Sequence, residues 1–280
     1  MLSRSSRKPL MKRLLACSLA LGIGMASIGA AAWAMRVSPM VAELSTSGAG
    51  STARIEVGNI GNAPLPFETL LTRMELDADG NVVETPADED FLVFPPQGIV
   101  AVGGRQVVRV QWIGSPDLQA SQAYYLWVKQ LPVATTPEPN DTGGSASVQV
   151  LYTMKALIVV APNGAQPDVR LVEAKPVKLS DEEIAAINSR AEEGAVSPTH
   201  GIRVTVSNQG RRYALMSGAN WVIEGTDISG QVFAHQFTGD EISASVGVGY
   251  LPPLNGRRTF TLPTPVELDG SKPVNVRFTR

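Results

Sequence analysis

The stretch Ser145–Pro162, SASVQVLYTMKALIVVAP, determines how the rest of the sequence is interpreted. Apolar side chains occupy every second position of its first half: Val148, Val150, Tyr152 and Met154. This period of two predicts a β-strand, because successive side chains of a strand point to opposite faces. From Ala156 to Ala161 both faces are apolar, which predicts burial on both sides. The strand is therefore either a covered core strand or an edge that docks another protein.

Residues 1–34 are expected to form a cleaved signal peptide. Basic residues precede an uncharged run from Leu14 to Trp33, and Ala32-Trp33-Ala34 supplies the small residues required for cleavage after Ala34. A membrane anchor is the alternative, since about 20 apolar residues span a bilayer. The run is rich in Gly, Ala and Ser, however, and no basic stop-transfer cluster follows it. Lipidation at Cys17 is a minor alternative. We expect export and no membrane insertion of the mature chain.

Removing residues 1–34 makes the protein acidic. The chain has 24 Lys and Arg and 26 Asp and Glu, and the removed segment holds five basic and no acidic residues. The remaining 19 basic and 26 acidic residues give a net charge of −7. Nucleic acid and anionic lipid are excluded as main partners, because both need clustered positive charge. The only cysteine, Cys17, is lost as well. A disulfide, a thiolate metal site and a cysteine nucleophile are therefore excluded.

The mature chain predicts an all-β protein with two β-sandwich domains, 35–162 and 168–280, joined by a linker at 163–167. The strands expected in the first domain are Val37–Leu44, Ala53–Val57, Leu65–Leu76, Phe91–Phe94, Gln106–Ile113 and Tyr124–Leu131, followed by the opening stretch. A hairpin turn is expected at 77–81. Residues 134–147 are expected to form a loop, because Pro, Gly and small polar residues dominate them.

The second half repeats this pattern with one exception. Ser180-x-x-Glu183 has the pattern of a capping box and predicts a short helix over Ser180–Arg190. The strands expected here are Gly201–Val206, Tyr213–Met216, Asn220–Ile223, Gln231–Phe237, Val246–Leu251, Arg258–Leu262 and Val274–Phe278. Trp221 is expected at the centre of the second core.

No arrangement of residues in the sequence predicts catalysis. His200 and His235 lie in different segments without a metal-ligand spacing, so we expect surface or structural histidines. Asp181 to Glu183 are expected to cap a helix, where negative charge is favourable. The acidic residues near Asp77 match no calcium-binding loop. We expect no enzyme, no cofactor and no metal.

Several short motifs, in order along the chain, resemble the periplasmic chaperones of the chaperone–usher pathway for pili and fimbriae. They are Val37-Ser38-Pro39, Val57-Gly58-Asn59, Pro95-Pro96, Gly103–Val110, Leu131-Pro132, the long strand ending at Pro162, Val206–Gly210 and Leu251-Pro252-Pro253. The resemblance covers the mature chain from about Val37 to its end. It implies two immunoglobulin-like domains in an L or boomerang arrangement, with a short helical insertion in the second.

The resemblance also implies a function. Such chaperones bind unfinished pilus or fimbrial subunits in the periplasm and deliver them to an outer-membrane usher. They lend one strand to a subunit whose own sandwich lacks its last strand. An added strand covers an apolar groove and pairs free backbone groups. The residues at the groove-filling positions are Val148, Val150, Tyr152 and Met154. The alternative is that these four side chains face the protein's own core.

Two departures from the family concern the basic residues that hold the subunit's C-terminal carboxylate. At those positions this chain has Val41 and Leu157, which cannot bind an anion. Lys155, about 7 Å along the same strand face, would replace the lysine in a shifted register, and Arg36 is a weaker candidate for the first-strand role. Ala161 stands where an arginine often precedes the linker proline. These departures favour a divergent branch, near the archaic or spore-coat-type systems.

Two other functions remain as alternatives. A surface adhesin or carbohydrate-binding sandwich would need exposed aromatic platforms, whereas Trp112, Trp127 and Trp221 lie in alternating patterns that favour the core. A secreted hydrolase would need a convergent polar site, and the sequence predicts none.

Overall fold

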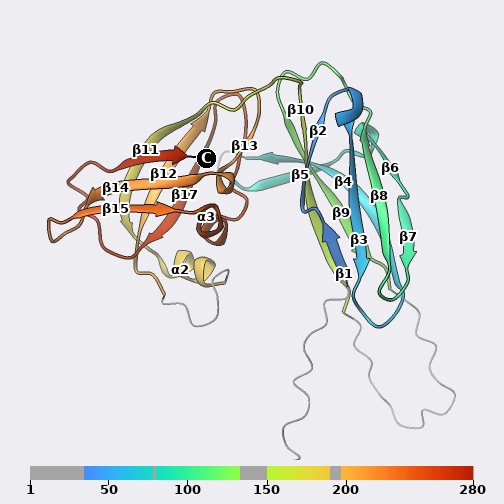
Figure 1. Ribbon diagram of the computed structural model, residues 1–280, viewed down its shortest axis with the longest axis horizontal. Helices are drawn as coiled ribbons and strands as arrows, with labels where there is room; N and C mark the ends of the chain where they lie inside the picture. The colour runs from blue at the N-terminus through green and yellow to red at the C-terminus, as the bar shows by residue number, and fades with distance from the viewer. Residues whose placement is uncertain (1–34, 78–79, 133–149, 190–196, 280) are drawn as a thin grey trace, which may run out of the picture.

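The structure is a computed structural model that describes residues 35–77, 80–132, 150–189 and 197–279. Over these ranges the chain is mostly β-strand, and Figure 1 shows two β-rich parts lying side by side along the long axis. The all-β, two-sandwich fold expected from the sequence is confirmed. The expected signal peptide, the loop at 134–147 and Val148 lie outside the described residues. Within the described ranges, no helix is long and apolar enough to cross a membrane.

The first sandwich has the strand order of an immunoglobulin domain. One sheet contains, in spatial order, β1 (Met35–Ser38), β3 (Thr52–Asn59), β8 (Arg105–Trp112) and β6 (Phe91–Phe94). The facing sheet contains β2 (Val41–Ser45), β10 (Thr153–Ala161), β9 (Gln122–Gln130), β4 (Leu65–Leu76) and β5 (Val82–Pro86), with β7 (Gln97–Val100) also pairing with β4. Short 3-10 turns lie at Gly48–Ser51 and Asp88–Asp90. This order follows the two sheets of variable-type immunoglobulin domains.

The inner faces of the two sheets form one apolar core. Phe67, Ile55 and Ile158 are fully buried in it. Phe91 packs edge-on against Trp112 and Tyr124, with ring centroids 5.1 and 4.8 Å apart. Edge-to-face contacts of this kind add to the gain from burial. Core packing and the hydrogen bonds between strands hold the first sandwich together, and the described residues contain no cysteine.

The expected single strand Val37–Leu44 is wrong, because the structure divides it between two sheets. β1 pairs with β3, whereas β2 pairs with β10. Pro39 separates them, and a proline has no N–H to donate to a ladder. Two short strands, β5 and β7, were not expected. They lie at the sheet edge, and Val82 and Val83 are exposed in succession, so β5 lacks the alternation of a half-buried strand.

The second sandwich packs two three-stranded sheets. One has the order β11 (Val169–Lys178), β12 (His200–Asn208) and β17 (Gly256–Thr264), and the other β15 (Val232–Phe237), β14 (Asn220–Thr226) and β18 (Asn275–Thr279). The short strands β13 (Ala214–Leu215) and β16 (Tyr250–Leu251) pair with each other. A 3-10 turn, Met216–Gly218, follows β13. Trp221 is fully buried and touches Phe260 and Phe278 edge-on, at 5.9 and 5.0 Å between centroids. The expected core centre is confirmed.

Two helices accompany this sandwich, and one of them was expected. α2 (Asp181–Asn188) begins with the expected capping box: Glu183 N donates to Ser180 Oγ at 3.2 Å, and Ser180 N donates to Glu183 Oε2 at 3.0 Å. α3 (Gly239–Val246) begins with the same device, built from Thr238 and Glu241, which sequence reasoning overlooked. The expected strand Val246–Leu251 is therefore wrong, and only Tyr250–Leu251 are extended. Gly247 and Gly249 have positive φ angles of 68° and 62°, which interrupt an extended chain.

The two sandwiches meet through a small apolar cluster with polar contacts at its rim. The buried members of the cluster are Met74, Ala123, Leu157 and Val159 of the first sandwich and Tyr213 and Tyr250 of the second. Tyr213 N donates to Ser121 Oγ at 2.8 Å, and Ser121 N donates to the carbonyl of Arg211 at 2.9 Å. The Glu43 carboxylate accepts from Arg212 and from the Tyr213 hydroxyl. Direct contacts therefore join the two sandwiches.

Candidate docking edge on strand β10

Strand β10 has two halves with different neighbours. Leu157–Ala161 lie between two strands, with β2 parallel on one side and β9 antiparallel on the other. Thr153–Ala156 pair with β9, and β2 begins opposite Leu157. Among the described residues, no strand covers the other side of Thr153–Ala156. The first half of β10 is thus an open edge of the six-stranded sheet.

The backbone groups that face this edge can be assigned from the hydrogen bonds. Leu157 N donates to Met40 O at 2.8 Å, on the β2 side, whereas Tyr152 O accepts from Gln130 N at 2.9 Å, on the β9 side. In a strand, the N–H and C=O of one residue point to the same edge, and the direction alternates along the chain. Thr153 and Lys155 therefore present their backbone groups to the open edge. An added strand would find two donors and two acceptors there.

The apolar side chains expected to fill the groove of a bound subunit, the client, differ in their exposure. Val150 is 61 % exposed and its neighbour Leu151 is 45 % exposed. Tyr152 and Met154 are partly buried and pack against the core of the first sandwich. β10 begins at Thr153, so Val150, Leu151 and Tyr152, which were expected in the strand, lie before it. Ala156–Ala161 are all buried, as expected for the half rooted in this protein.

Lys155 lies on the outer face of the sheet, at the end of a row that crosses four strands. Its Nζ donates to Glu84 Oε1 at 2.6 Å, although β9 and β4 separate β10 from β5. Glu84 Oε2 accepts from Trp127 Nε1 at 2.9 Å and from the hydroxyl of Thr72. The ammonium also lies over the ring of Trp127, 3.8 Å from its centroid, and 5.2 Å from that of Tyr125. The Lys155 side chain thus extends across the sheet, away from the open edge.

The surroundings of Glu84 favour its charged form. Burial by itself raises the pKa of a carboxyl group, but hydrogen bonds from Lys155, Thr72 and Trp127 outweigh burial here, so the pKa of Glu84 lies below its ordinary value of 4.5. Next to this row, burial raises the pKa of Tyr125, with a further contribution from the Glu84 charge. At neutral pH Glu84 is therefore a carboxylate.

Arg36 does not lie near Lys155. It belongs to β1 in the opposite sheet, and its neighbours Met35 and Val37 are buried in the core, so Arg36 points away from the core on the other outer face. Its guanidinium lies 3.9 Å from Glu56, which also contacts Arg105 at 3.6 Å. The fold thus places the two candidate cations on opposite faces of one sandwich, and a single carboxylate cannot contact both.

The two apolar residues at the family's cation positions are neighbours. Val41 and Leu157 are register partners in the parallel pair of β2 and β10. Leu157 is buried in the cluster that joins the two sandwiches, and Val41 packs against that cluster. The junction is therefore apolar at the two positions where the resembled family has basic residues, in line with the expectation that Val41 and Leu157 cannot bind an anion.

Trp127 corrects one expectation about the aromatic residues. Trp112 and Trp221 are buried as expected, but Trp127 lies on the outer face, because its neighbours Leu126 and Val128 point into the core. Its ring is in contact with the Lys155 ammonium, and the Lys129 ammonium lies 5.3 Å from its centroid. The alternating pattern correctly predicts a strand here, but it assigns the wrong face.

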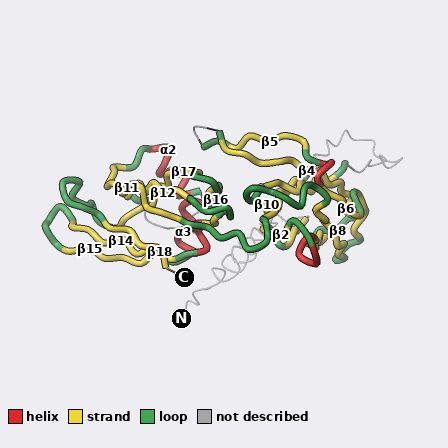
Figure 2. Tube along the Cα trace, turned by 90° about the horizontal axis from the view of Figure 1, so that it is seen from above, coloured by secondary structure: helices red, strands yellow, loops and turns green. Residues whose placement is uncertain are grey.

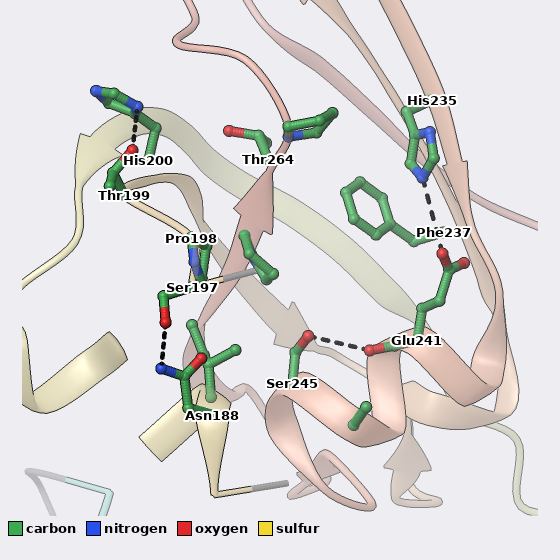
Figure 3. A pocket seen from close by; sticks show the side chains of 14 residues that line it. Asn188, Ser197, Pro198, Thr199, His200, His235, Phe237, Glu241, Ser245 and Thr264 are labelled. Carbon is green, nitrogen blue, oxygen red and sulfur yellow. Dashed lines mark hydrogen bonds and ion pairs between the residues drawn. The ribbon is translucent and has the colours of Figure 1, made fainter. Parts of the chain in front are cut away.

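Both histidines line one hollow of the second sandwich, shown in Figure 3. Its volume is about 660 Å³, and Phe237, Pro198 and Pro263 contribute apolar surface. His200 Nε2 lies 3.2 Å from Glu267 Oε2, and His235 Nε2 lies 4.0 Å from Glu241 Oε1. Glu241 also caps α3. In the described part of the chain, no group of three His, Cys, Asp or Glu is arranged to hold a metal ion.

Glu84 was overlooked in the sequence. It is 71 residues from Lys155 along the chain, and it follows two valines in a segment without clear periodicity. The turn at 77–81 predicts that the chain reverses there, but not which residues of β5 lie over Trp127. That placement depends on the order of β5, β4, β9 and β10 in the sheet.

No family model matches this chain, and no curated protein sequence matches it. Comparison with solved structures finds pilus and fimbrial chaperones. The class 5 fimbriae chaperone CfaA is 11 % identical over 88 % of this chain and 99 % of its own, with a TM-score of 0.48. The Escherichia coli chaperone DraB is 16 % identical over 88 % of this chain and 95 % of its own, with a TM-score of 0.45.

The pre-assembly complex of the chaperone CsuC and the tip subunit CsuE, from the archaic Csu pili of Acinetobacter baumannii, is similar as well. The matched chain is 9 % identical over 81 % of this chain and 89 % of its own, with a TM-score of 0.45. These solved structures are chaperones of fimbriae or pili, or complexes that contain one.

Proposed function

We propose that this protein is a periplasmic chaperone that captures pilus or fimbrial subunits by lending them the first half of β10, and that it delivers them to an outer-membrane usher. The sequence motifs, read in order, support this family. The expected signal peptide supports export to the periplasm. Capture by strand donation is a binding function, and it requires no catalytic residue, metal or cofactor.

The observation that carries the proposal is the open edge at Thr153–Ala156. An immunoglobulin-type sandwich that lacks its last strand has an apolar groove and a row of unpaired backbone groups. The Thr153 and Lys155 backbone groups point away from β9, where a client strand could pair with them. Main-chain pairing of this kind is a general mode of recognition, in which alternate side chains supply specificity.

The side chains near this edge support the proposal to different degrees. Val150 and Leu151 are exposed apolar residues next to the edge, so a client groove could bury them. Tyr152 and Met154 pack partly against this protein's own core. We infer that Tyr152 and Met154 contact both this protein's core and the core of the client. Val150, together with Val148, would fill the client's groove. Each fully buried side chain would contribute about 1.5–3 kcal/mol, before the cost of ordering the segment.

The proposal is tested with small secreted proteins encoded beside this gene, each co-expressed with the chaperone. We expect a subunit to co-purify with the wild type and to be lost from the double variant Val150→Asp plus Tyr152→Asp, because each substitution would bury an unpaired charge where the chaperone and the subunit meet. Wild-type-like capture by the double variant would contradict strand donation. Since Tyr152 touches the chaperone's core, the single variant Val150→Asp separates lost binding from lost folding.

A matched control is Val232→Asp. Val232 is 86 % exposed on β15 in the second sandwich, away from the proposed edge. This variant introduces the same charge at the same residue type on an exposed strand. We expect it to capture the subunit as well as the wild type does. Equal loss of capture in Val150→Asp and Val232→Asp would show that added charge, and not the edge, is responsible.

A further inference from the structure

The Glu84 carboxylate holds the Lys155 ammonium that a negatively charged ligand at the open edge would need. It accepts a hydrogen bond of 2.6 Å from Lys155 Nζ, and Trp127 Nε1 and the Thr72 hydroxyl donate to its second oxygen. Charge-assisted hydrogen bonds are among the strongest that side chains make. The pair is also accessible, since the side chains of Lys155 and Glu84 are 37 % and 20 % exposed. A ligand can therefore reach it from solvent.

The strand that carries Glu84 is peripheral to the fold. β5 is the last strand of its sheet and pairs with β4. Its residues other than Glu84 are exposed. In Figures 1 and 2 the β4–β5 hairpin projects from the first sandwich toward the second. A carboxylate on such a strand can be withdrawn from Lys155 without opening the core.

We infer that Glu84 is an internal competitor: it holds the Lys155 ammonium across the sheet until the carboxylate of a bound client replaces it. This inference rests on the proposed function, because the client carboxylate reaches Lys155 only when a client strand lies on the β10 edge. Lys155 would then turn from Glu84 toward the edge that its own backbone lines. Glu84 thereby lowers the affinity of the site for clients that carry a carboxylate.

The competition has a direct physical consequence. A client with a carboxylate must break the hydrogen bond between Lys155 and Glu84. Its carboxylate therefore adds to the binding free energy only the difference between two similar ion pairs. A client without a carboxylate leaves that bond intact and binds through the edge alone. Removing the negative charge from Glu84 therefore strengthens binding of the first kind of client and leaves the second unchanged. Gln at position 84 keeps an oxygen that can accept from Trp127.

The test uses a short synthetic peptide of alternating valine and threonine, prepared with a free C-terminal carboxylate or with a C-terminal amide. Dissociation constants are measured by fluorescence anisotropy for the wild type and for Glu84→Gln. We expect Glu84→Gln to bind the carboxylate peptide about tenfold more tightly than the wild type does, because the peptide no longer has to displace a charge-assisted hydrogen bond. The amide peptide should bind both proteins equally, which also shows that the edge is intact.

Two further variants complete the design. Glu75→Gln removes a carboxylate of the same hairpin that pairs with Arg73 at 3.0 Å, and it should bind both peptides as the wild type does. Lys155→Ala should abolish any preference for the carboxylate, both alone and combined with Glu84→Gln. If Glu84→Gln and the wild type bind the carboxylate peptide equally, the competition is disproved, whereas edge capture stands. If neither peptide binds any variant, edge capture by the proposed function is contradicted as well.

Discussion

The two halves of strand β10 differ in what covers them, although they belong to one continuous strand. Ala156–Ala161 are buried on both faces, and from Leu157 onward they pair with strands on both sides. Thr153–Lys155 pair with β9 on one side and are partly or fully exposed. The buried half contributes to the stability of the sandwich, and the open half is available for binding. One strand can therefore be rooted in a sandwich along one half and leave an open edge along the other, because its partner strand begins halfway along it.

The largest expected effect concerns the buried half. Ile158 is fully buried in the first core, so Ile158→Ala removes apolar contacts and leaves a cavity. We expect a loss of about 2–5 kcal/mol in the free energy of unfolding. Urea unfolding, followed by tryptophan fluorescence, measures this loss. A loss below about 0.5 kcal/mol, typical of surface sites, would mean that this half is not part of the core.

A smaller effect is expected at the boundary between the halves, where Lys155 contacts Glu84. Glu84→Gln should cost on the order of 1 kcal/mol at pH 7, since the pair is partly exposed and solvent screens it. The pKa of Glu84 is lower in the folded state than its ordinary 4.5. The charged carboxylate therefore stabilises the folded state above about that pH, and this contribution is lost as the pH falls through the lowered pKa.

The measurement is the difference in thermal stability between the wild type and Glu84→Gln from pH 7 down to pH 3. We expect the difference to be constant at neutral pH and to shrink below about pH 4.5. The control Glu75→Gln should show a smaller difference at pH 7, because Glu75 is 61 % exposed. A difference that grows as the pH falls would show that Glu84 is not stabilised as a carboxylate in the folded protein.

The smallest effect on stability is expected in the open half. Val150 is 61 % exposed, so Val150→Asp should change the free energy of unfolding by less than about 0.5 kcal/mol. The same variant should lower affinity for a client. Stability by urea unfolding and capture of a co-expressed subunit are therefore measured on one preparation. A large loss of stability would place Val150 in this protein's own core and remove the contrast between the halves.

Local patterns in the sequence predict much of the fold. β4 was expected over the range that the structure gives it, because its flanking turn residues mark both ends. α2 was expected from its capping box, and the same reasoning applied to Thr238 and Glu241 would have found α3. Patterns fail where one segment divides between two sheets, as at Pro39. They also fail at short edge strands such as β5, where both faces are exposed and no alternation exists.

The sequence by itself determined that this is an all-β protein of two sandwiches with a long alternating strand before the second one. Turn residues, the period of two and the absence of cysteine from residues 35–280 are local or compositional properties, so they can be read without coordinates. Only the tertiary structure decided which side of β10 is open, which face Trp127 occupies and which carboxylate holds Lys155. These depend on the order of strands in a sheet, and strand order follows from packing between residues far apart in the chain.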